Sequence, residues 1–412
     1  MAARTLADAQ LNVEELHGVY NRLSFSPLGG RVVQWDVRRR ELVPEKQRRG
    51  SEWLTVLKTN AAARSSSARF ASSVMFPWCN RIGGRFWKTN DFEEIPVDTS
   101  TSNGRLHGLV YDRVFDVVRS KFNLVEFRVV LAPSKFYPFH VALNVIYELR
   151  SEMGSEFLDV KMRAENLDTR VAPVTMGVHP YFLCDRGQTT DDMEIRLRVS
   201  KEVHVDKALI PVRMGTVQRI HDFSRLTRIR DTQLDVAYAV PSRRGDDTLL
   251  GGEQQTTERG AEPESRRLKP FPEDEDAWTE SESSGDEAPA AAGKNAAGGG
   301  HGDGDDDDSS DEGQRVLKRI EQKTIHHHMP KDTWKEGDFC AHVMSAEHQV
   351  KVRPVKNVRF VHVYIPPERK SIALEPTSGA ADAFRREAEF GARHLQPGET
   401  FDMQVQFNAT FI

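Results

Sequence analysis

Cysteine is scarce in this chain, and only Cys79, Cys184 and Cys340 occur among its 412 residues. Their number is odd and no two have C-x-x-C spacing, which argues against a disulfide framework and a cysteine-based zinc site. Three histidines stand side by side at 326–328, but neighbouring side chains on a strand point to opposite faces. We therefore expect no metal site, and we expect a reducing compartment.

Long apolar runs and targeting signals are also missing. No run approaches the roughly 18 apolar residues of a membrane-spanning helix, and the first residues, Met1–Asp8, lack the apolar segment of a signal peptide. No glycine-rich phosphate loop of the Walker or dinucleotide type opens a helix. These absences predict a cytoplasmic protein with no membrane partner, no nucleotide and no other cofactor.

The charge is divided unevenly along the chain. Residues 242–313 contain 21 acidic and 7 basic residues, a net charge of −14, so the rest of the chain carries +9 of the total of −5. A mildly basic body with an acidic segment is not the signature of a nucleic-acid-binding protein. It suits an anionic substrate or neighbour instead.

The same acidic segment interrupts the domain. It is rich in glycine, serine and aspartate, and Phe271 and Trp278 are its only aromatic residues. Such a composition buries too little apolar surface to offset the entropy of ordering the chain. We expect a single domain made of residues 1–241 and 314–412, with 242–313 as a disordered acidic insertion that offers a surface to a basic protein partner.

Strict alternation of apolar and polar residues dominates the stretch from 124 to 199. Val141, Leu143, Val145, Tyr147 and Leu149 alternate with more polar neighbours. This period of two predicts half-buried strands, and short turns between them favour an antiparallel sheet. No strand-to-helix alternation is present, so the predicted fold class is all-β.

His179 is the first candidate for chemistry. It lies between Gly177 and Pro180, with Tyr181 and Phe182 following, a frame that can hold an imidazole in place and keep it partly dry. Imidazole titrates near neutral pH and is therefore suited to proton transfer. The alternative is a hydrogen-bonded packing histidine.

Other polar residues stand in comparable settings. Asn80 and Arg81 follow Trp78, and the three residues together offer donors, an acceptor and an apolar face, a mixture that suits a sugar. The same residues are equally typical of a turn with an aromatic anchor. Asp235 lies among apolar residues, where a carboxylate is either paired or functional. Glu375 ends an apolar run before a proline, the setting of a fixed general base or of a salt-bridged loop residue.

In its motifs and their order, the chain resembles the aldose 1-epimerase (galactose mutarotase) family. The likeness covers about residues 23–408 apart from the insertion, and its motifs are Pro77–Ile82 with Gly84–Phe86, Leu106–Gly108, Gly177–Phe182, Leu234–Asp235, Leu374–Pro376 and Leu395–Glu399. The resemblance implies a large antiparallel β-sandwich of the galactose mutarotase type. It also implies a glucose- or galactose-type sugar as substrate, with no metal or cofactor.

The resemblance also implies a role for each candidate. His179 would be the general acid at the ring oxygen, and Glu375 the general base at the anomeric hydroxyl. The residues that would bind sugar hydroxyls are Arg81, His107 and Asp235, with Asn80 close by. The chain departs from the family pattern in the insertion, in Cys79 and in residues 378–381.

Two other functions remain open at this point. The basic body and Arg69, Arg81 and Arg85 would suit a hexose-6-phosphate 1-epimerase on the same fold. A non-catalytic carbohydrate-binding or scaffold protein would instead use the insertion to recruit its partner. The sequence leaves the preferred hexose and the oligomeric state open.

Overall fold

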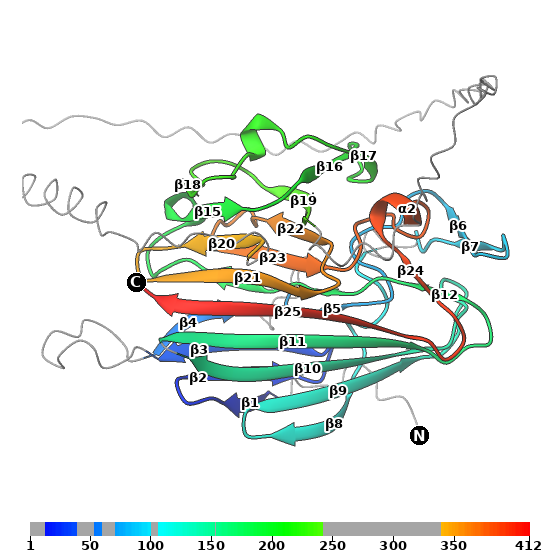
Figure 1. Ribbon diagram of the computed structural model, residues 1–412, viewed down its shortest axis with the longest axis horizontal. Helices are drawn as coiled ribbons and strands as arrows, with labels where there is room; N and C mark the ends of the chain where they lie inside the picture. The colour runs from blue at the N-terminus through cyan, green and yellow to red at the C-terminus, as the bar shows by residue number, and fades with distance from the viewer. Residues whose placement is uncertain (1–12, 39–52, 60–70, 100–105, 153, 242–338) are drawn as a thin grey trace, which may run out of the picture. The chain divides into compact units, whose positions relative to one another are not determined.

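The computed structural model describes residues 13–38, 53–59, 71–99, 106–152, 154–241 and 339–412 (Figure 1). All of them belong to one compact unit, Met1–Gly252 with Lys335–Ile412. The predicted insertion, 242–313, lies outside the described residues, and so do residues 314–338 of the predicted domain.

The first sheet has twelve strands. Ten of them follow one another in the order β1 (Glu14–His17), β2 (Asn21–Ser26), β3 (Arg31–Arg38), β4 (Trp53–Lys58), β14 (Tyr181–Leu183), β23 (Ser371–Thr377), β22 (Phe360–Tyr364), β19 (Asp235–Ala239), β16 (Lys201–Val205) and β17 (Pro211–Gly215). Two short strands complete it, β13 (Gly177–Val178), which pairs with β23, and β5 (Val74–Met75), which pairs with β13.

The second sheet has nine strands. Their order is β18 (Thr227–Arg228), β15 (Glu194–Leu197), β20 (Ala341–Met344), β21 (His348–Lys356), β25 (Thr400–Phe411), β11 (Ser155–Asn166), β10 (Val141–Glu152), β9 (Leu124–Leu131) and β8 (Asp116–Lys121). Figure 1 shows the long strands β25, β11, β10 and β9 running side by side.

The remaining elements are short. Two small ladders join β12 (Ala172–Val174) to β24 (Arg393–Leu395) and β6 (Phe86–Lys88) to β7 (Glu94–Pro96). The helical elements of the described residues are η3 (Thr190–Asp192), η4 (Arg219–His221) and α2 (Glu387–Phe390). Within the described part of the chain, no helix is both long and apolar enough to cross a bilayer.

The two large sheets pack face to face through apolar side chains. The ring of Phe182 on β14 lies 5.6 Å from that of Phe407 on β25, and the ring of Phe25 on β2 lies 5.4 Å from that of Phe127 on β9. The Tyr147 hydroxyl on β10 donates a 2.7 Å hydrogen bond to the Gly30 carbonyl beside β3. These contacts make the fold a β-sandwich with its core between the sheets.

The observed strands follow the predicted alternation. In β10, buried and partly exposed side chains alternate, and Val145 lies opposite Met162 of β11 in an antiparallel register. Every ladder between the described strands is antiparallel. The all-β prediction and the antiparallel sandwich are therefore confirmed.

Alternation also decides which side chains of the first sheet leave the core. Phe182 points toward the second sheet and lies opposite Ile372 in the register of β14 and β23. Its neighbour Tyr181, and Glu375 three residues after Ile372, therefore point to the other face. That outer face carries the candidate site.

Candidate active site

Four adjacent segments of the first sheet bring the central residues together. His179 lies between β13 and β14, Glu375 on β23, His362 on β22 and Asp235 at the start of β19. In the register, His362 is directly opposite Glu375 and Asp235 is opposite Tyr364. Because alternate residues share a face, all four side chains lie on one side of the sheet.

His179 and Glu375 touch each other. The distance from His179 Nε2 to Glu375 Oε1 is 3.3 Å, and the two side chains are only 6% and 3% exposed. The His179 ring stacks on Tyr181 with ring centroids 4.9 Å apart and planes at 9°. Its backbone carbonyl accepts a 2.9 Å hydrogen bond from the Ser72 amide, so ring and backbone are both fixed.

Burial changes the protonation of this pair. It raises the pKa of Glu375 to about 7, because a charged carboxylate is poorly solvated there, and the charges of His362 and Arg81 only partly oppose the effect. Burial likewise lowers the pKa of His179 to about 3, with a further lowering by the charge of His362. Between these values the pair holds one proton.

Asn80 and His107 form a second wall of the site. Their backbones adopt φ values of +55° and +58°, which shape two tight turns. The His107 amide donates to the Asn80 carbonyl at 2.8 Å, and the Asn80 amide donates to His107 Nδ1 at 3.3 Å. Since Nδ1 accepts a hydrogen bond, the proton of the neutral ring is assigned to Nε2.

Glycine is required beside His107. Gly108 has φ of +80° and forms a bridge with Phe76, and a Cβ added there would lie 2.1 Å from the Phe76 carbonyl oxygen. This close approach places the His107 ring against His179, with centroids 5.1 Å apart and planes at 69°. Burial holds the pKa of His107 well below its ordinary value, so the ring is neutral.

Arg81 is half-buried next to these residues. Its Nη1 donates to Asn80 Oδ1 at 3.1 Å, and its backbone pairs with Leu106 in a bridge. Its positive charge lowers the pKa of both Asp235 and Glu375. The structure thus brings Arg81, Asn80 and His107 to the same place as the three residues predicted on the sheet.

The loop after Glu375 holds the Arg81 segment in position. The Asp382 amide donates to the Arg81 carbonyl at 2.6 Å, and Asp382 Oδ1 accepts a 2.8 Å hydrogen bond from the Gly83 amide. Asp382 is buried and also lies 3.5 Å from Arg385 Nη1. Sequence reasoning missed it, although it stands alone between alanines, a signal of the kind that drew attention to Asp235.

His362 was also missed by sequence reasoning. Its Nε2 lies 2.7 Å from Asp235 Oδ1, and its side chain is 13% exposed. Burial alone would lower the pKa of His362, but the charges of Glu375 and Asp235 outweigh that effect and raise it. The alternation Val361-His362-Val363 could have indicated a strand, but only the pairing with β23 places the ring beside Glu375.

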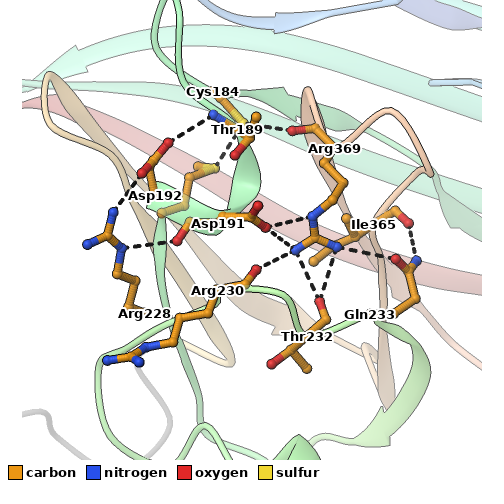
Figure 2. Close-up of polar contacts among 11 residues, drawn as sticks. Cys184, Thr189, Asp191, Asp192, Arg228, Arg230, Thr232, Gln233, Ile365 and Arg369 are labelled. Carbon is orange, nitrogen blue, oxygen red and sulfur yellow. Dashed lines mark hydrogen bonds and ion pairs between the residues drawn. The ribbon is translucent and has the colours of Figure 1, made fainter.

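A polar network connects the β22–β23 turn to the loop that precedes β19 (Figure 2). Figure 2 shows the Arg369 guanidinium between the Asp191 carboxylate and backbone carbonyls of the loop that leads into β19. Arg369 Nε donates to Asp191 Oδ1 at 2.6 Å, and Nη2 donates to the Arg230 carbonyl at 2.5 Å. Gln233 Nε2 donates to the Ile365 carbonyl at 2.5 Å. The β22–β23 turn is thereby tied to the strand that carries Asp235.

One group in the described part of the chain has the composition of a metal site. His107, His179 and Glu375 are all buried, and one possible ligand atom of each lies within 4.8 Å of the others. Two of these residues are also the predicted acid and base. A metal ion and a sugar would therefore compete for the same atoms.

The sequence of this chain matches the model of a known protein family. The model of the aldose 1-epimerase family matches residues 16–264, more than half of the 412-residue chain. The match includes His107, His179 and Asp235 and ends before Glu375. Among curated proteins, the chain is 28% identical over 167 residues to the uncharacterized protein YihR of Escherichia coli (strain K12), a match that spans 40% of this chain and about half (53%) of that protein.

Solved structures resemble the fold over almost the whole chain. The GalM/aldose epimerase homologue from C. elegans has a TM-score of 0.63 at 12% identity, with 98% of this chain and 99% of that chain covered. A galactose mutarotase-like protein from Clostridium acetobutylicum has a TM-score of 0.61 at 12% identity, with the same coverage of 98% and 99%. At such identities the likeness concerns the fold alone, and the predicted sandwich of the galactose mutarotase type is confirmed.

Proposed function

Because the chain belongs to the aldose 1-epimerase family, we propose that it exchanges the α and β anomers of free hexoses of the glucose and galactose type. The observation that carries the proposal is the buried contact between His179 Nε2 and Glu375 Oε1, at 3.3 Å. Anomer exchange needs one group that takes a proton from the anomeric hydroxyl and one that gives a proton to the ring oxygen. A buried pair that shares a single proton supplies both.

Glu375 and His179 divide the reaction between them. Glu375 removes the proton from O1 while His179 donates a proton to the ring oxygen O5, so the C1–O5 bond breaks and an open-chain aldehyde forms. Rotation about C1–C2 presents the other face of the carbonyl. The same two proton transfers in reverse close the ring as the opposite anomer and return the pair to its starting state.

The pKa values of the pair define its resting state. With a pKa of about 7 at Glu375 and about 3 at His179, the pair carries one proton across the range between them. These values place the proton on Glu375, and it crosses the 3.3 Å contact to His179 before the ring opens. The form with protonated His179 and ionised Glu375 is the one that opens the ring.

The surrounding residues bind the sugar. In the proposal, His107 donates its Nε2 proton to a hydroxyl, Arg81 donates from its guanidinium, and Asp235 accepts from another hydroxyl. Asn80 holds Arg81 and His107 through its side chain and backbone. Donors and acceptors around the acid and base suit a polyhydroxylated ring.

Polarimetry tests the proposal directly. Freshly dissolved α-D-glucose and α-D-galactose change rotation slowly in buffer, and the purified full-length protein should accelerate this change at catalytic concentrations. Unchanged decay of both sugars would refute the proposed reaction and favour a non-catalytic carbohydrate-binding protein.

The same assay separates free sugars from their phosphates. A phosphate group requires several charge-assisted contacts, whereas Arg81 already donates to Asn80, Arg85 is exposed, and Arg69 lies outside the described residues. We expect a higher kcat/KM for glucose than for glucose 6-phosphate. A preference of about tenfold or more for the phosphate, some 1.4 kcal/mol, would make the hexose-6-phosphate 1-epimerase the better description.

The proposed setting is the cytoplasm, and the thiols support it. Cys79 and Cys340 are buried free thiols, and Cys184 is a partly buried one. A basic partner of the acidic insertion remains a prediction, because residues 242–313 lie outside the described residues.

A further inference from the structure

His362 occupies the strand next to the proposed base. It lies directly opposite Glu375 on one side and Ala237 on the other, so its ring points to the face of the sheet that carries the site. Side chains that face each other across two antiparallel strands have Cβ atoms about 5 Å apart. His362 is therefore a close neighbour of Glu375, although the proposed proton transfers do not use it.

Asp235 fixes the His362 ring. The 2.7 Å contact between His362 Nε2 and Asp235 Oδ1 has the length of a charge-assisted hydrogen bond. The charged and titratable groups that face the ring are Asp235 from β19, Glu375 from β23, and Arg81, with His107 and His179 beyond. The charge of Asp235 and the ionised form of Glu375 outweigh the opposing effects of burial and of the Arg81 guanidinium, and they raise the pKa of His362 above its ordinary value.

We propose that His362 is a positioning residue for the His179–Glu375 pair. Its positive charge, one strand away from Glu375, sets the pH range in which the pair keeps one proton. The consequence for catalysis rests on the proposed function. The electrostatic coupling between His362 and Glu375 is a property of the folded chain and can be measured without a substrate.

The direction of the effect follows from the charges. A positive charge on His362 lowers the pKa of Glu375 and also that of His179. Removing the charge therefore raises both values, and the whole range in which the pair holds one proton moves to higher pH. A purely structural His362 would instead change activity by a similar factor at every pH.

The variant His362→Gln separates charge from hydrogen bonding. Glutamine retains an N–H that can donate to Asp235 but carries no charge. We expect the bell-shaped pH dependence of kcat/KM to move to higher pH by about one unit, the shift typical of a nearby charge, with KM little changed.

The matched control is His204→Gln on β16, two strands away in the same sheet, where His204 Nε2 lies 3.1 Å from the Thr216 carbonyl oxygen. Its profile should match that of the parent protein, and a His362→Gln profile centred at the parental pH overturns the inference.

Carboxyl carbon NMR provides a readout that does not depend on activity. In ¹³C-labelled protein, the Glu375 carboxyl should titrate near 7 in the parent and at higher pH in His362→Gln. If the parent does not exchange anomers but this shift occurs, the proposed function fails and the coupling stands. If the parent is active and the Glu375 titration is the same in both proteins, the coupling fails and the function stands.

If His362→Gln does not fold, the inference is tested by titrating the His362 ring in the parent protein. The His362 ring should then titrate above the ordinary histidine value of 6.5. Titration of this ring at or below that value in the parent overturns the inference as well.

Discussion

Two buried histidine–carboxylate pairs flank the same three-residue strand, β14. Before the strand, His179 lies 3.3 Å from Glu375. After it, Asp185 Oδ1 lies 3.0 Å from His348 Nδ1 at the start of β21. The residue types, the distances and the burial are alike, yet the two carboxyl groups behave in opposite ways.

The difference lies in the other donors that each carboxylate receives. Asp185 also accepts hydrogen bonds from the Ser345 hydroxyl at 2.9 Å and from the Glu347 amide at 2.9 Å. Burial would raise the pKa of Asp185, but these bonds and His348 hold it below its ordinary value. Within the described part of the chain, Glu375 has no comparable donor besides His179, and burial raises its pKa.

The comparison distinguishes a structural pair from the proposed reactive pair. Asp185 ties the end of β14 in the first sheet to the β20–β21 turn of the second, as a fully satisfied anion. Ser345 and Asp185 both contact the same nitrogen of His348, so this group also lacks the relay geometry of a catalytic triad. Glu375 is left poorly satisfied, which is the state in which a carboxyl exchanges a proton near neutral pH.

The largest expected effect is on turnover. Glu375→Gln and His179→Asn should each lower kcat by roughly 10²- to 10⁴-fold, the contribution of one general catalyst, with a smaller change in sugar affinity. Polarimetry at saturating sugar measures the change, and Glu94→Gln at an exposed position of β7 is the matched control. Normal turnover in Glu375→Gln would remove this residue from the mechanism.

The pH dependence of stability should have opposite signs for the two carboxyls. Glu375 binds its proton more tightly in the folded chain, so its contribution to the free energy of unfolding falls as pH rises from about 4.5 to about 7. Asp185 binds its proton less tightly, so its contribution is present above pH 3.8 and is lost as pH falls through the lowered folded value. Urea unfolding across this range measures the free energy of unfolding of both proteins. Relative to the parent, the value for Glu375→Gln should rise toward pH 7 by on the order of 3 kcal/mol. A flat difference between the two proteins would show that Glu375 has an ordinary pKa.

The next effect concerns Asp185 itself. Asp185→Asn removes an anion from three donors and should cost about 1–3 kcal/mol in the free energy of unfolding at pH 7, with kcat unchanged. Chemical denaturation measures the loss, and Asp116→Asn on the exposed strand β8 serves as the control. A fall in kcat without a loss of stability would mean that the two ends of β14 do not have separate roles.

The smallest effect is expected for Ser345→Ala. This variant removes one hydrogen bond to Asp185, worth about 1 kcal/mol, and leaves the other two. The contacts of the Ser345 hydroxyl with His348 are lost with it. The Asp185 carboxyl should also titrate at a slightly higher pH in carboxyl NMR, because one donor that lowers its pKa is gone. An unchanged titration would assign the low value to His348 and the Glu347 amide alone.

Much of the fold could be predicted because alternation is a local property. The polar and apolar residues of 141–149 already determine which side of β10 is buried, and the short turns favour antiparallel pairing. The candidate residues His179, Glu375 and Asp235 could be named because each stands in an unusual local setting. The structure brings them together with Arg81 and His107, and their roles as site residues stay a prediction.

His362 and Asp382 show where local reasoning ends. Each is a single polar residue in an apolar stretch, and its side-chain or backbone contact lies far away in the sequence: Asp235 is 127 residues from His362, and Arg81 precedes Asp382 by about three hundred. Nothing in the text around His362 indicates that β22 pairs with β23 in a register that sets it against Glu375. Likewise, the contact of Asp382 with the Arg81 backbone depends on how two loops meet above the sheet.

The sequence by itself therefore determined the strand pattern, the face of each strand that is buried and the residue types available for proton transfer, because these depend on neighbours in the chain. Only the tertiary structure decided the protonation of those residues. Glu375 and Asp185 are both acidic side chains near a histidine, but one is desolvated with few donors and the other is surrounded by them. A carboxyl pKa depends on the solvent, dipoles and charges around the group, and in this protein strands distant in sequence supply them.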